Sequence, residues 1–575
     1  MKDIKIKTYM FLKTKLLFKN TTQQIIKRTA FNSLVLFLAP MVLLSSCDNF
    51  LDVEPYSTIS PDTFLTNEIN AESALTGVYN ALSAGTINGR GNASSFRRGM
   101  LHILNSGTDE TVGTSVAIDY FPLYFYTYNP GSNFGRDAWL FLNAGISRAN
   151  FLLESLEGIK FEDPARKEQV KAEARFLRAV YYQYLAYIYG AVPIKLSTAD
   201  DRLADAERKS LQEVYAIIEA DLLFAHQTLN ETSNRPGTAN KFSAAGFLSK
   251  MYTYLASCKE NNVGKDFPDI TINSFDWVDS DEMYKKAYDI NTSIIGKKAL
   301  TASYFHLFRT EKNASTYDEV LFGVEATDNQ DVVIIYVEAF IPQGNSATVG
   351  GGFGGMRPGQ DLVNKYDKVN DVRFKNNITG NLGGNPALLT TEILDGTTYY
   401  VPFALPATIA PTFRNLCIGK WRYPKPGSNS LETWASDCNF QLIRYADILL
   451  LQAELEFKHK KNEDAARGYL KMVRERATEK NAAKLSLLTT NYFKADFMTE
   501  LMDERSRELC FETWRRIDLI RTGTLKSTLN SALITGNGNQ SQMSLTKANF
   551  QPFHIWYPIP VNEFINKKMV QNSGY

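Results

Sequence analysis

Apolar residues recur every four positions along residues 166–189, which is the spacing of one face of an α-helix. This row consists of Phe176, Val180, Tyr184 and Ile188. Gly190 and Pro193 follow it, and both residue types end helices. The pattern therefore predicts a helix over residues 166–189, with its apolar face toward a core.

Five further stretches have the helical period: residues 210–229, 243–256, 280–295, 446–457 and 462–477. Ser210 and Glu213 make a capping box at the start of the first stretch. The last stretch carries a predicted buried stripe of Ala466, Leu470, Val473 and Ala477. Stacked helix pairs of this kind resemble tetratricopeptide repeats, although they do not keep the strict period of about 34 residues.

Two long segments lack a helical period. Residues 88–137 and 340–440 are rich in Gly, Asn, Ser, Thr and Pro, and long irregular segments of a folded chain usually carry function. The apolar run at residues 331–340 predicts a strand. We therefore expect a mostly α-helical fold, in which tetratricopeptide-like helix pairs form a scaffold with long irregular loops and a few short strands.

The N-terminal residues have the pattern of a secretory signal. A basic flank at residues 27–28 precedes an apolar run at residues 31–44, which is shorter than the roughly 20 residues of a membrane span. Two serines and Cys47 follow in an arrangement that resembles the lipobox of bacterial lipoproteins. We therefore expect a lipoprotein signal peptide over residues 1–46 and a lipid on Cys47 that anchors the protein to a membrane. An ordinary signal peptide with an unrelated cysteine is the alternative, and the long Lys-rich start leaves the true start codon open.

The composition argues against several classes of protein. The chain has 63 Lys and Arg residues and 62 Asp and Glu residues, which gives a formal net charge of +1. Without a basic excess, nothing points to nucleic acid or to anionic lipid as a partner. Besides Cys47 there are only Cys258, Cys417, Cys438 and Cys510, too few for a disulfide framework in 575 residues. Whether Cys417 pairs with Cys438 stays open.

Three glutamates near the C-terminus raise the question of catalysis. Glu504, Glu508 and Glu512 lie four positions apart, hence on one face of a predicted helix. A glycosidase needs two carboxyl groups about 5–10 Å apart across an open cleft. Here arginines alternate with the acids, and Glu512 can reach Arg516 at a spacing of four. We therefore predict a structural ion-pair network and no catalytic residue.

No motif for a metal or a nucleotide stands out. The histidines at positions 102, 226, 306, 459 and 554 are scattered, so we expect no catalytic metal. A calcium ion on loop carboxylates stays open. Residues 350–355, GGGFGG, match a dinucleotide-binding glycine pattern, but no helix is expected to begin directly after them. We therefore predict a loop there and no cofactor.

Four stretches, in this order, identify a family. They are CDNFLDVEP at residues 47–55, LIRYADILLLQAEL at 442–455, DERSRELCFETWRRIDLIRTG at 503–523 and WYPIPVNEFINKKMVQNSGY at 556–575. Together they resemble the SusD/RagB family of outer-membrane nutrient-uptake lipoproteins. The predicted helix at residues 166–189 fits the N-terminal half of that family.

The resemblance implies a function and a partner. It implies a tetratricopeptide-like scaffold whose looped face binds oligosaccharide or polysaccharide, with an N-terminal SusD-like half over residues 47–300 and a C-terminal RagB/SusD half over residues 301–575. It implies delivery of the glycan to a TonB-dependent transporter of the SusC type, which the protein covers as a lid. It also implies a lipid-anchored protein that faces outward from the outer membrane and performs no catalysis.

Aromatic residues are the best candidates for ligand contacts, because Tyr and Trp rings stack on the flat faces of sugars. Six rings crowd one segment, and no single face of a helix or strand can bury them all: Tyr120, Phe121, Tyr124, Phe125, Tyr126 and Tyr128. Their place is similar to that of aromatic sugar contacts in the starch-binding member of the family. We predict ligand contacts by Tyr120, Phe121, Tyr124 and, in a polar loop, Trp434. For each ring, packing in the core or against the transporter is the alternative.

Two other functions stay open at this point. One is a surface glycoside hydrolase that uses carboxylates such as Glu504 and Glu508. The other keeps the scaffold and the transporter but binds peptide in place of glycan. The loops that would recognise the ligand follow no transferable code, so the sequence does not name it.

Overall fold

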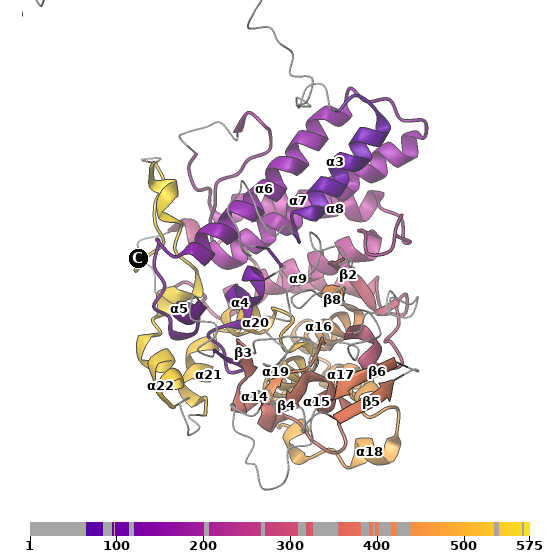
Figure 1. The fold of residues 1–575 in the computed structure, drawn as a ribbon, viewed down its shortest axis with the longest axis vertical. Coiled ribbons are helices and arrows are strands. Elements are labelled where there is room, and N and C mark those ends of the chain that lie inside the picture. Colours follow the sequence, from indigo (N-terminus) through magenta and orange to yellow (C-terminus); the bar gives the residue numbers. More distant parts are fainter. Residues whose placement is uncertain are drawn as a thin grey trace, which may run out of the picture. The chain divides into compact units, whose positions relative to one another are not determined.

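Helices that pack side by side in chain order make up most of the structure (Figure 1). The computed structural model describes residues 65–83, 95–96, 98–113, 120–200, 206–265, 271–308, 318–325, 355–380, 390–394, 397–401, 416–421, 438–533, 540–565 and 568–575. The unit that contains them spans Leu65–Tyr575. The predicted signal peptide at residues 1–46, Cys47 and the predicted strand at residues 331–340 lie outside the described residues.

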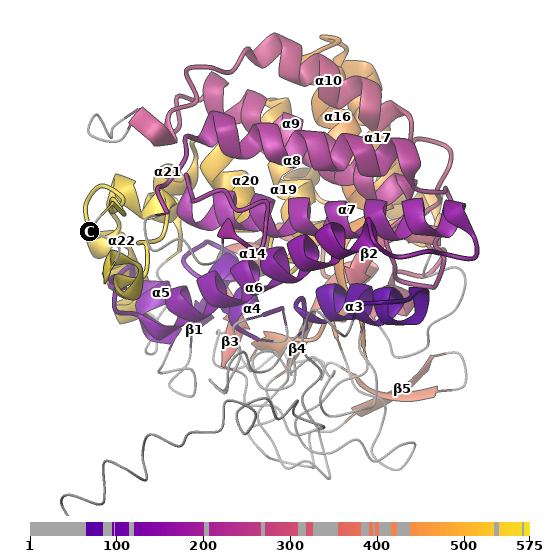
Figure 2. The same ribbon diagram turned by 90° about the horizontal axis from the view of Figure 1, so that it is seen from above.

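A series of long helices forms the scaffold, and each packs against the one before it. The series runs through α3 (Glu68–Asn80), α6 (Asn133–Leu156), α7 (Pro164–Tyr189), α8 (Leu211–Thr228), α9 (Lys241–Glu260) and α10 (Ser280–Thr292). It continues with α16 (Tyr445–Lys458), which packs on α10, and α17 (Glu463–Ala477), which packs on α16. Figure 2 shows the row from α10 at the top to α3 at the bottom.

Short elements complete the described chain. The helices are α4 (Gly99–Asn105), α5 (Phe121–Phe125), α14 (Gln360–Lys365), α15 (Val372–Asn377), α18 (Ala482–Ser486), α19 (Phe497–Leu509), α20 (Arg515–Arg521), α21 (Leu525–Ser531) and α22 (Gln540–Asn549). The described strands form antiparallel pairs: β1 (Thr111–Gly113) with β3 (Met356–Pro358), β2 (Val320–Val324) with β8 (Phe440–Arg444), β4 (Ile378–Gly380) with β7 (Leu416–Ile418), and β5 (Thr390–Leu394) with β6 (Thr397–Val401).

The predicted fold class is confirmed, and every stretch with a helical period is a helix. At the start of α8 the Ser210 hydroxyl accepts from the Glu213 backbone N–H at 3.3 Å, and the Glu213 carboxylate accepts from the Ser210 N–H at 2.9 Å. This is the predicted capping box, which satisfies two backbone donors at the helix end. The predicted stripe of α17 is also buried.

The prediction that residues 88–137 form one irregular loop is wrong in part. The segment contains α4, β1, α5 and the start of α6. The buried residues Ala138, Leu142, Ile146 and Ala149 of α6 recur at the helical spacing, a pattern that sequence reasoning missed. Gly145, in the middle of α6, lies where the ring of Tyr181 on α7 would overlap any side-chain carbon. The glycine weakens the helix locally but lets α6 and α7 approach closely. Residues 340–440 likewise hold β3, α14, α15 and β4 to β7.

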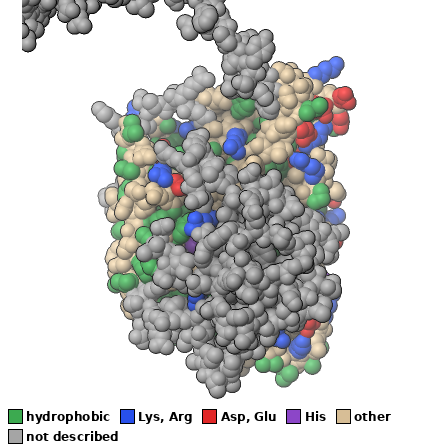
Figure 3. Space-filling view, in the orientation of Figure 1, with side chains coloured by type: hydrophobic (Ala, Val, Ile, Leu, Met, Phe, Trp, Pro, Cys, Tyr) green, Lys and Arg blue, Asp and Glu red, His purple; other side chains and the backbone are tan. Residues whose placement is uncertain are grey.

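Charges of both signs mix on the described surface. In the view of Figure 3, Lys and Arg side chains lie among Asp and Glu side chains at the upper right, while hydrophobic side chains gather along the left edge. This mixture agrees with the formal net charge of +1.

Asn572 joins the C-terminal segment to the N-terminal helices. Its side-chain NH₂ donates to the carbonyl oxygens of Tyr189, at 2.9 Å, and Tyr557, at 2.8 Å. Its side-chain oxygen accepts from Arg208 Nη2 at 2.6 Å and from Asn273 Nδ2 at 3.0 Å. Three of these four bonds, to Tyr189, Arg208 and Asn273, cross the boundary at residues 300 and 301. The predicted division into two halves stays a prediction about the sequence.

We expect Asn572→Ala to lower the free energy of unfolding by about 2–5 kcal/mol, because it leaves the buried Arg208 guanidinium and two buried carbonyls short of a partner. Guanidinium denaturation followed by circular dichroism measures this. Asn530→Ala, at an exposed position on α21, is the matched control and should unfold like the parent. Equal unfolding of both variants would contradict a bridging role for Asn572.

Candidate functional site

The predicted aromatic contacts lie mostly inside the structure. Tyr120 is 7% exposed and Tyr124 is 3% exposed. The Tyr120 ring stacks on His102 with centroids 3.9 Å apart, and the Tyr124 ring covers Gly113, where a side-chain carbon would come within 2.7 Å of it. These contacts bury the rings against α4 and β1.

As predicted, no single face buries the six rings, but four of them, Tyr120, Tyr124, Tyr126 and Tyr128, are buried among several elements. Tyr126 has a positive φ of 55°, so the chain turns after α5 and directs the next rings toward other neighbours. The Tyr126 hydroxyl accepts from Arg516 Nη1 at 2.9 Å, and Tyr128 stacks on Tyr557 with centroids 4.6 Å apart. Several elements, rather than one face, therefore take up the rings.

The ligand contacts predicted for Tyr120, Phe121 and Tyr124 stay predictions. Of these three rings, Phe121 keeps the most exposed surface, beside Phe125 at a centroid distance of 5.3 Å. Trp434 lies outside the described residues, and so does Cys47. Cys417 and Cys438 are buried thiols, so they do not form the disulfide that the sequence left open.

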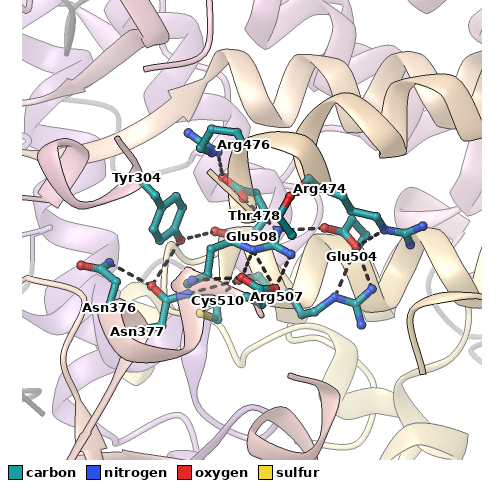
Figure 4. A network of polar contacts seen from close by, with 12 residues as sticks. Tyr304, Asn376, Asn377, Arg474, Arg476, Thr478, Glu504, Arg507, Glu508 and Cys510 are labelled. Atoms are coloured by element: carbon teal, nitrogen blue, oxygen red, sulfur yellow. Dashed lines mark hydrogen bonds and ion pairs between the residues drawn. The ribbon is translucent and has the colours of Figure 1, made fainter. Parts of the chain in front are cut away.

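The predicted ion-pair network exists and is centred on α19 (Figure 4). Glu508 pairs with Arg476 at 2.5 Å, with Arg444 at 3.0 Å and with Arg373 at 3.0 Å. Glu504, one turn earlier on α19, pairs with Arg373 at 2.8 Å. Its other partners are Arg474, at 2.9 Å, and Arg507, at 2.7 Å.

Glu512 does not share the helical face of Glu504 and Glu508, contrary to the prediction. Helix α19 ends at Leu509, and the positive φ angles of Phe511, 67°, and Thr513, 71°, turn the chain before α20. Of the three glutamates, only Glu504 and Glu508 therefore share the helical face that a spacing of four residues predicts.

The predicted Glu512–Arg516 pair is also wrong. Glu512 pairs with Lys420 at 2.6 Å and with Arg444 at 2.7 Å. Because the chain turns between the two helices, Arg516 points elsewhere and donates to the hydroxyl of Tyr126.

Among the described residues, six basic and six acidic side chains form one connected buried network, each at most 4% exposed. They are Arg373, Lys420, Arg444, Arg474, Arg476 and Arg507 with Glu319, Asp371, Glu500, Glu504, Glu508 and Glu512. Burial alone would raise the pKa of Glu508, but Arg476, Arg444 and Arg373 hold it at about 2. A carboxylate that stays ionised and enclosed cannot donate a proton to a sugar oxygen, so Glu508 is not placed to act as the general acid of a glycosidase.

A cavity of about 450 Å³ lies at the end of α3, away from the buried network. Three segments line it: α3 and the residues after it, the turn at residues 235–238, and the end of β2. Thr76, Asn80, Arg235, Thr238 and Glu325 bring hydrogen-bonding groups to it, and Tyr79 brings a ring. We call it the α3 cavity. Pockets of this size that combine an apolar wall with a few polar groups are typical of small-molecule sites.

The Tyr79 ring is fixed in place in the wall of the α3 cavity. Its hydroxyl donates to the Glu173 carboxylate at 2.7 Å and accepts from the backbone N–H of Ala239 at 2.9 Å. Burial, and then the charge of Glu173, raise the pKa of Tyr79 well above its usual value, so the phenol stays neutral. Hydrogen bonds at the hydroxyl group therefore hold the Tyr79 ring in place, and the flat face of the ring remains available for packing.

Glu325, which also lines the α3 cavity, packs closely against Gly237. Gly237 has a φ of +79°, and any side-chain carbon on it would overlap the Glu325 carboxylate. The other carboxylate oxygen of Glu325 accepts from Asn439 Nδ2 at 2.8 Å. Sequence reasoning missed this cavity, because its lining comes from three distant segments and only the Pro-Gly pair at residues 236–237 marks a turn.

The β2–β8 pair links the α3 cavity to the buried network. At one end of the pair, Glu319 and Arg444 lie 2.7 Å apart inside the network. At the other end, Glu325 lines the cavity and accepts a hydrogen bond from Asn439. One five-residue strand therefore separates a buried network charge from a cavity carboxylate.

In the part of the chain that the structure describes, no helix combines the length and the apolar character that a membrane span requires. No group of three or more His, Cys, Asp or Glu side chains there could hold a metal ion.

The stacked helix pairs place the chain among helical-repeat proteins of the tetratricopeptide type. The sequence model of the SusD family matches residues 318–575, and a second model, described as starch-binding associating with outer membrane, matches residues 49–253. Together the two models cover most of the chain, which belongs to the SusD/RagB family.

Named relatives agree with this assignment. The starch-binding protein SusD of Bacteroides thetaiotaomicron is 24% identical over 503 residues, which cover 78% of this chain and 80% of SusD. A SusD-like protein of Formosa agariphila is 23% identical and covers 92% of this chain and 97% of its own length. These relatives are named as binding proteins or by family, and not as enzymes.

Solved structures share the fold. The crystal structure of a SusD homologue from Bacteroides thetaiotaomicron has a TM-score of 0.71 at 21% identity and covers 90% of this chain and 98% of its own. Surface glycan-binding protein A from the same species, in complex with laminarihexaose, has a TM-score of 0.64 at 17% identity and covers 88% of this chain and 100% of its own.

We expect Glu508→Gln to lower the free energy of unfolding by about 3–5 kcal/mol, because it leaves buried arginines without their counter-charge. The folded pKa of Glu508 is about 2, below its ordinary 4.5. Its stabilising contribution is therefore full above pH 4.5 and is lost as the pH falls toward 2. As the pH is lowered from 4.5 toward 2, the melting temperatures of the parent and the variant should therefore converge.

Glu463→Gln is the control for this prediction. Glu463 pairs with Arg467 at 2.7 Å on the exposed side of α17, and such exposed pairs contribute only about 0.3–0.5 kcal/mol. A Glu508→Gln protein that melts like the Glu463→Gln protein would show that the network contributes little.

Proposed function

We propose that the protein binds oligosaccharide or polysaccharide in the α3 cavity and delivers it to a TonB-dependent transporter of the SusC type. It acts without catalysis or cofactor, as an outer-membrane protein that faces outward and is anchored through a lipid on Cys47. The α3 cavity carries this proposal, because it combines a fixed ring with hydrogen-bonding groups from three segments. The relatives named for starch, laminarin and laminarihexaose support a glycan as the ligand class.

The chemistry of the α3 cavity suits a sugar. The flat side of Tyr79 can stack on the C–H face of a pyranose. Asn80 and Arg235 offer N–H donors, and Glu325 offers a carboxylate acceptor for hydroxyl groups. In this proposal Phe121, on α5, and Trp434 are further contacts for a longer chain, whereas the buried Tyr120 and Tyr124 hold α5 in place.

Binding is favoured over hydrolysis by the number of acids at the site. Glu325 is the one carboxylate among the described residues that line the α3 cavity. A glycoside hydrolase uses two carboxyl groups that flank the bond to be cut. The paired acids of the network lie in the core and each is at most 4% exposed, so they cannot supply the second.

Arg235→Ala should weaken glycan binding by about 1.5–3 kcal/mol, which is the range for a hydrogen bond from a charged group. The fold should not change, because Arg235 is exposed. A glycan array run beside a peptide pool identifies the ligand, and calorimetry then measures its affinity for parent and variant.

Arg136→Ala is the matched control. Arg136 pairs with Asp137 at 2.7 Å on α6. Farther along the same helix, Arg148 donates to the carbonyl oxygen of Gly77 on α3, and Arg136 lies more than three helical turns before it. It should bind like the parent. Selective binding of peptides, or new reducing ends in the glycan mixture, would overturn glycan delivery in favour of peptide uptake or hydrolysis.

Cys47→Ala should remove the lipid and release the protein from the membrane fraction, because the thiol is the attachment point in a lipobox. Metabolic labelling with a palmitate analogue, followed by membrane fractionation, measures both effects. Label that persists on the Cys47→Ala protein would refute the anchor, and a Cys258→Ala protein should remain labelled.

A further inference from the structure

A second cavity of about 390 Å³ lies at the C-terminal end of α9. Its lining comes from the last residues of α9, the turn that follows and the segment before α10, and includes Lys259, Asn262, Ser274 and Asp276. We call it the α9 cavity. Its volume falls in the range of small-molecule sites, about 300–1,000 Å³.

The α9 cavity has a fixed aromatic wall. Phe275 lines it and stacks on Trp556 with centroids 6.4 Å apart and planes 25° apart. Gly264 also lines it with a φ of +81°, and a side-chain carbon there would come within 3.0 Å of the Trp556 ring. A side chain at this position would press on the indole and strain the backbone, so glycine suits the close approach of the turn to Trp556.

The rim of the α9 cavity offers donors and acceptors together. Lys259 Nζ lies 3.1 Å from the Asp276 carboxylate, whose side chain is 92% exposed. The Asp276 carboxylate would repel an anion, and the Lys259 ammonium group would repel a metal cation. Hydroxyl groups both donate and accept, so they fit this pair and the neighbouring Asn262 and Ser274.

Helix α9 fixes the spacing between the two cavities. The turn that lines the α3 cavity ends at Thr238, just before α9 begins, and the α9 cavity begins at Cys258. The 20 residues of α9 span about 30 Å. Residues 242–258 of the helix are all buried, so neighbouring helices keep it from bending.

We propose that the α9 cavity is a second saccharide-binding site, which holds a further segment of the polysaccharide bound at the α3 cavity. This inference rests on the proposed function. A polysaccharide that spans about 30 Å can occupy both cavities, and the second contact then forms within one complex at a high effective concentration. A short oligosaccharide fills each cavity separately.

The test compares four proteins: the parent, the α3-cavity variant Arg235→Ala, the α9-cavity variant Lys259→Ala/Asp276→Ala, and their combination. Calorimetry uses starch, laminarin, xylan and pectin as polysaccharides, and the six-sugar fragment of whichever binds. The parent should bind two fragments per chain and the α9-cavity variant one. The polysaccharide affinity of that variant should fall about tenfold or more.

Lys285→Ala/Asp289→Ala is the matched control, because it removes another exposed Lys–Asp pair, 2.6 Å apart on α10. It should bind like the parent. One fragment per parent chain, with parent-like polysaccharide affinity in the α9-cavity variant, would overturn the second site and leave the proposed function intact.

The remaining outcomes separate the two proposals. Loss of binding in the α9-cavity variant, with parent-like binding by Arg235→Ala, would support the second site and remove the α3 cavity from the proposed function. A parent that binds none of the four polysaccharides overturns both proposals.

Discussion

The buried network around α19 is the constraint on which the rest of the structure depends. A charge inside a protein is tolerated only when it is paired and hydrogen-bonded, and removing one partner is strongly destabilising. The paired groups come from segments far apart in the chain, such as Glu319 before β2, Arg373 on α15, Arg444 at the end of β8 and Arg476 on α17. All these segments must meet in one arrangement before every charge is satisfied, so the network fixes their positions together.

The sequence predicts the scaffold where one local pattern is enough. Helices α7, α8 and α17 have apolar rows and caps that can be recognised within a single stretch. Helix α6 has such a row too, in Ala138, Leu142, Ile146 and Ala149, but no side chain caps its N-terminus, and the reason for its Gly145 is hidden, because this glycine makes room for the Tyr181 ring of another helix. The turn at Phe511 and Thr513 is equally hidden, since neither residue type favours a positive φ. The sequence shows that Glu508 needs basic partners, but its partners Arg373 and Arg444 come from distant segments.

The candidate sites were harder to predict than the fold. Crowding of rings at residues 120–128 is visible in the sequence, yet their burial depends on His102, Gly113 and Tyr557, which no local pattern connects to them. The α3 cavity has the opposite difficulty. Asn80, Arg235 and Glu325 are ordinary polar residues, and only the packing of three segments makes them neighbours.

The β2–β8 pair has a consequence for how such a protein can change over generations. Its network end, Glu319 with Arg444, cannot be altered without exposing the fold to unpaired charge. Its cavity end, Glu325 with Asn439, carries no such penalty, because a carboxylate and an amide at a partly open site can be exchanged for other side chains. Mutation can therefore alter the polar groups of the cavity at one end of a five-residue strand while the other end continues to hold the core together. Under the proposed function, this division separates the residues that select the ligand from those that keep the scaffold stable.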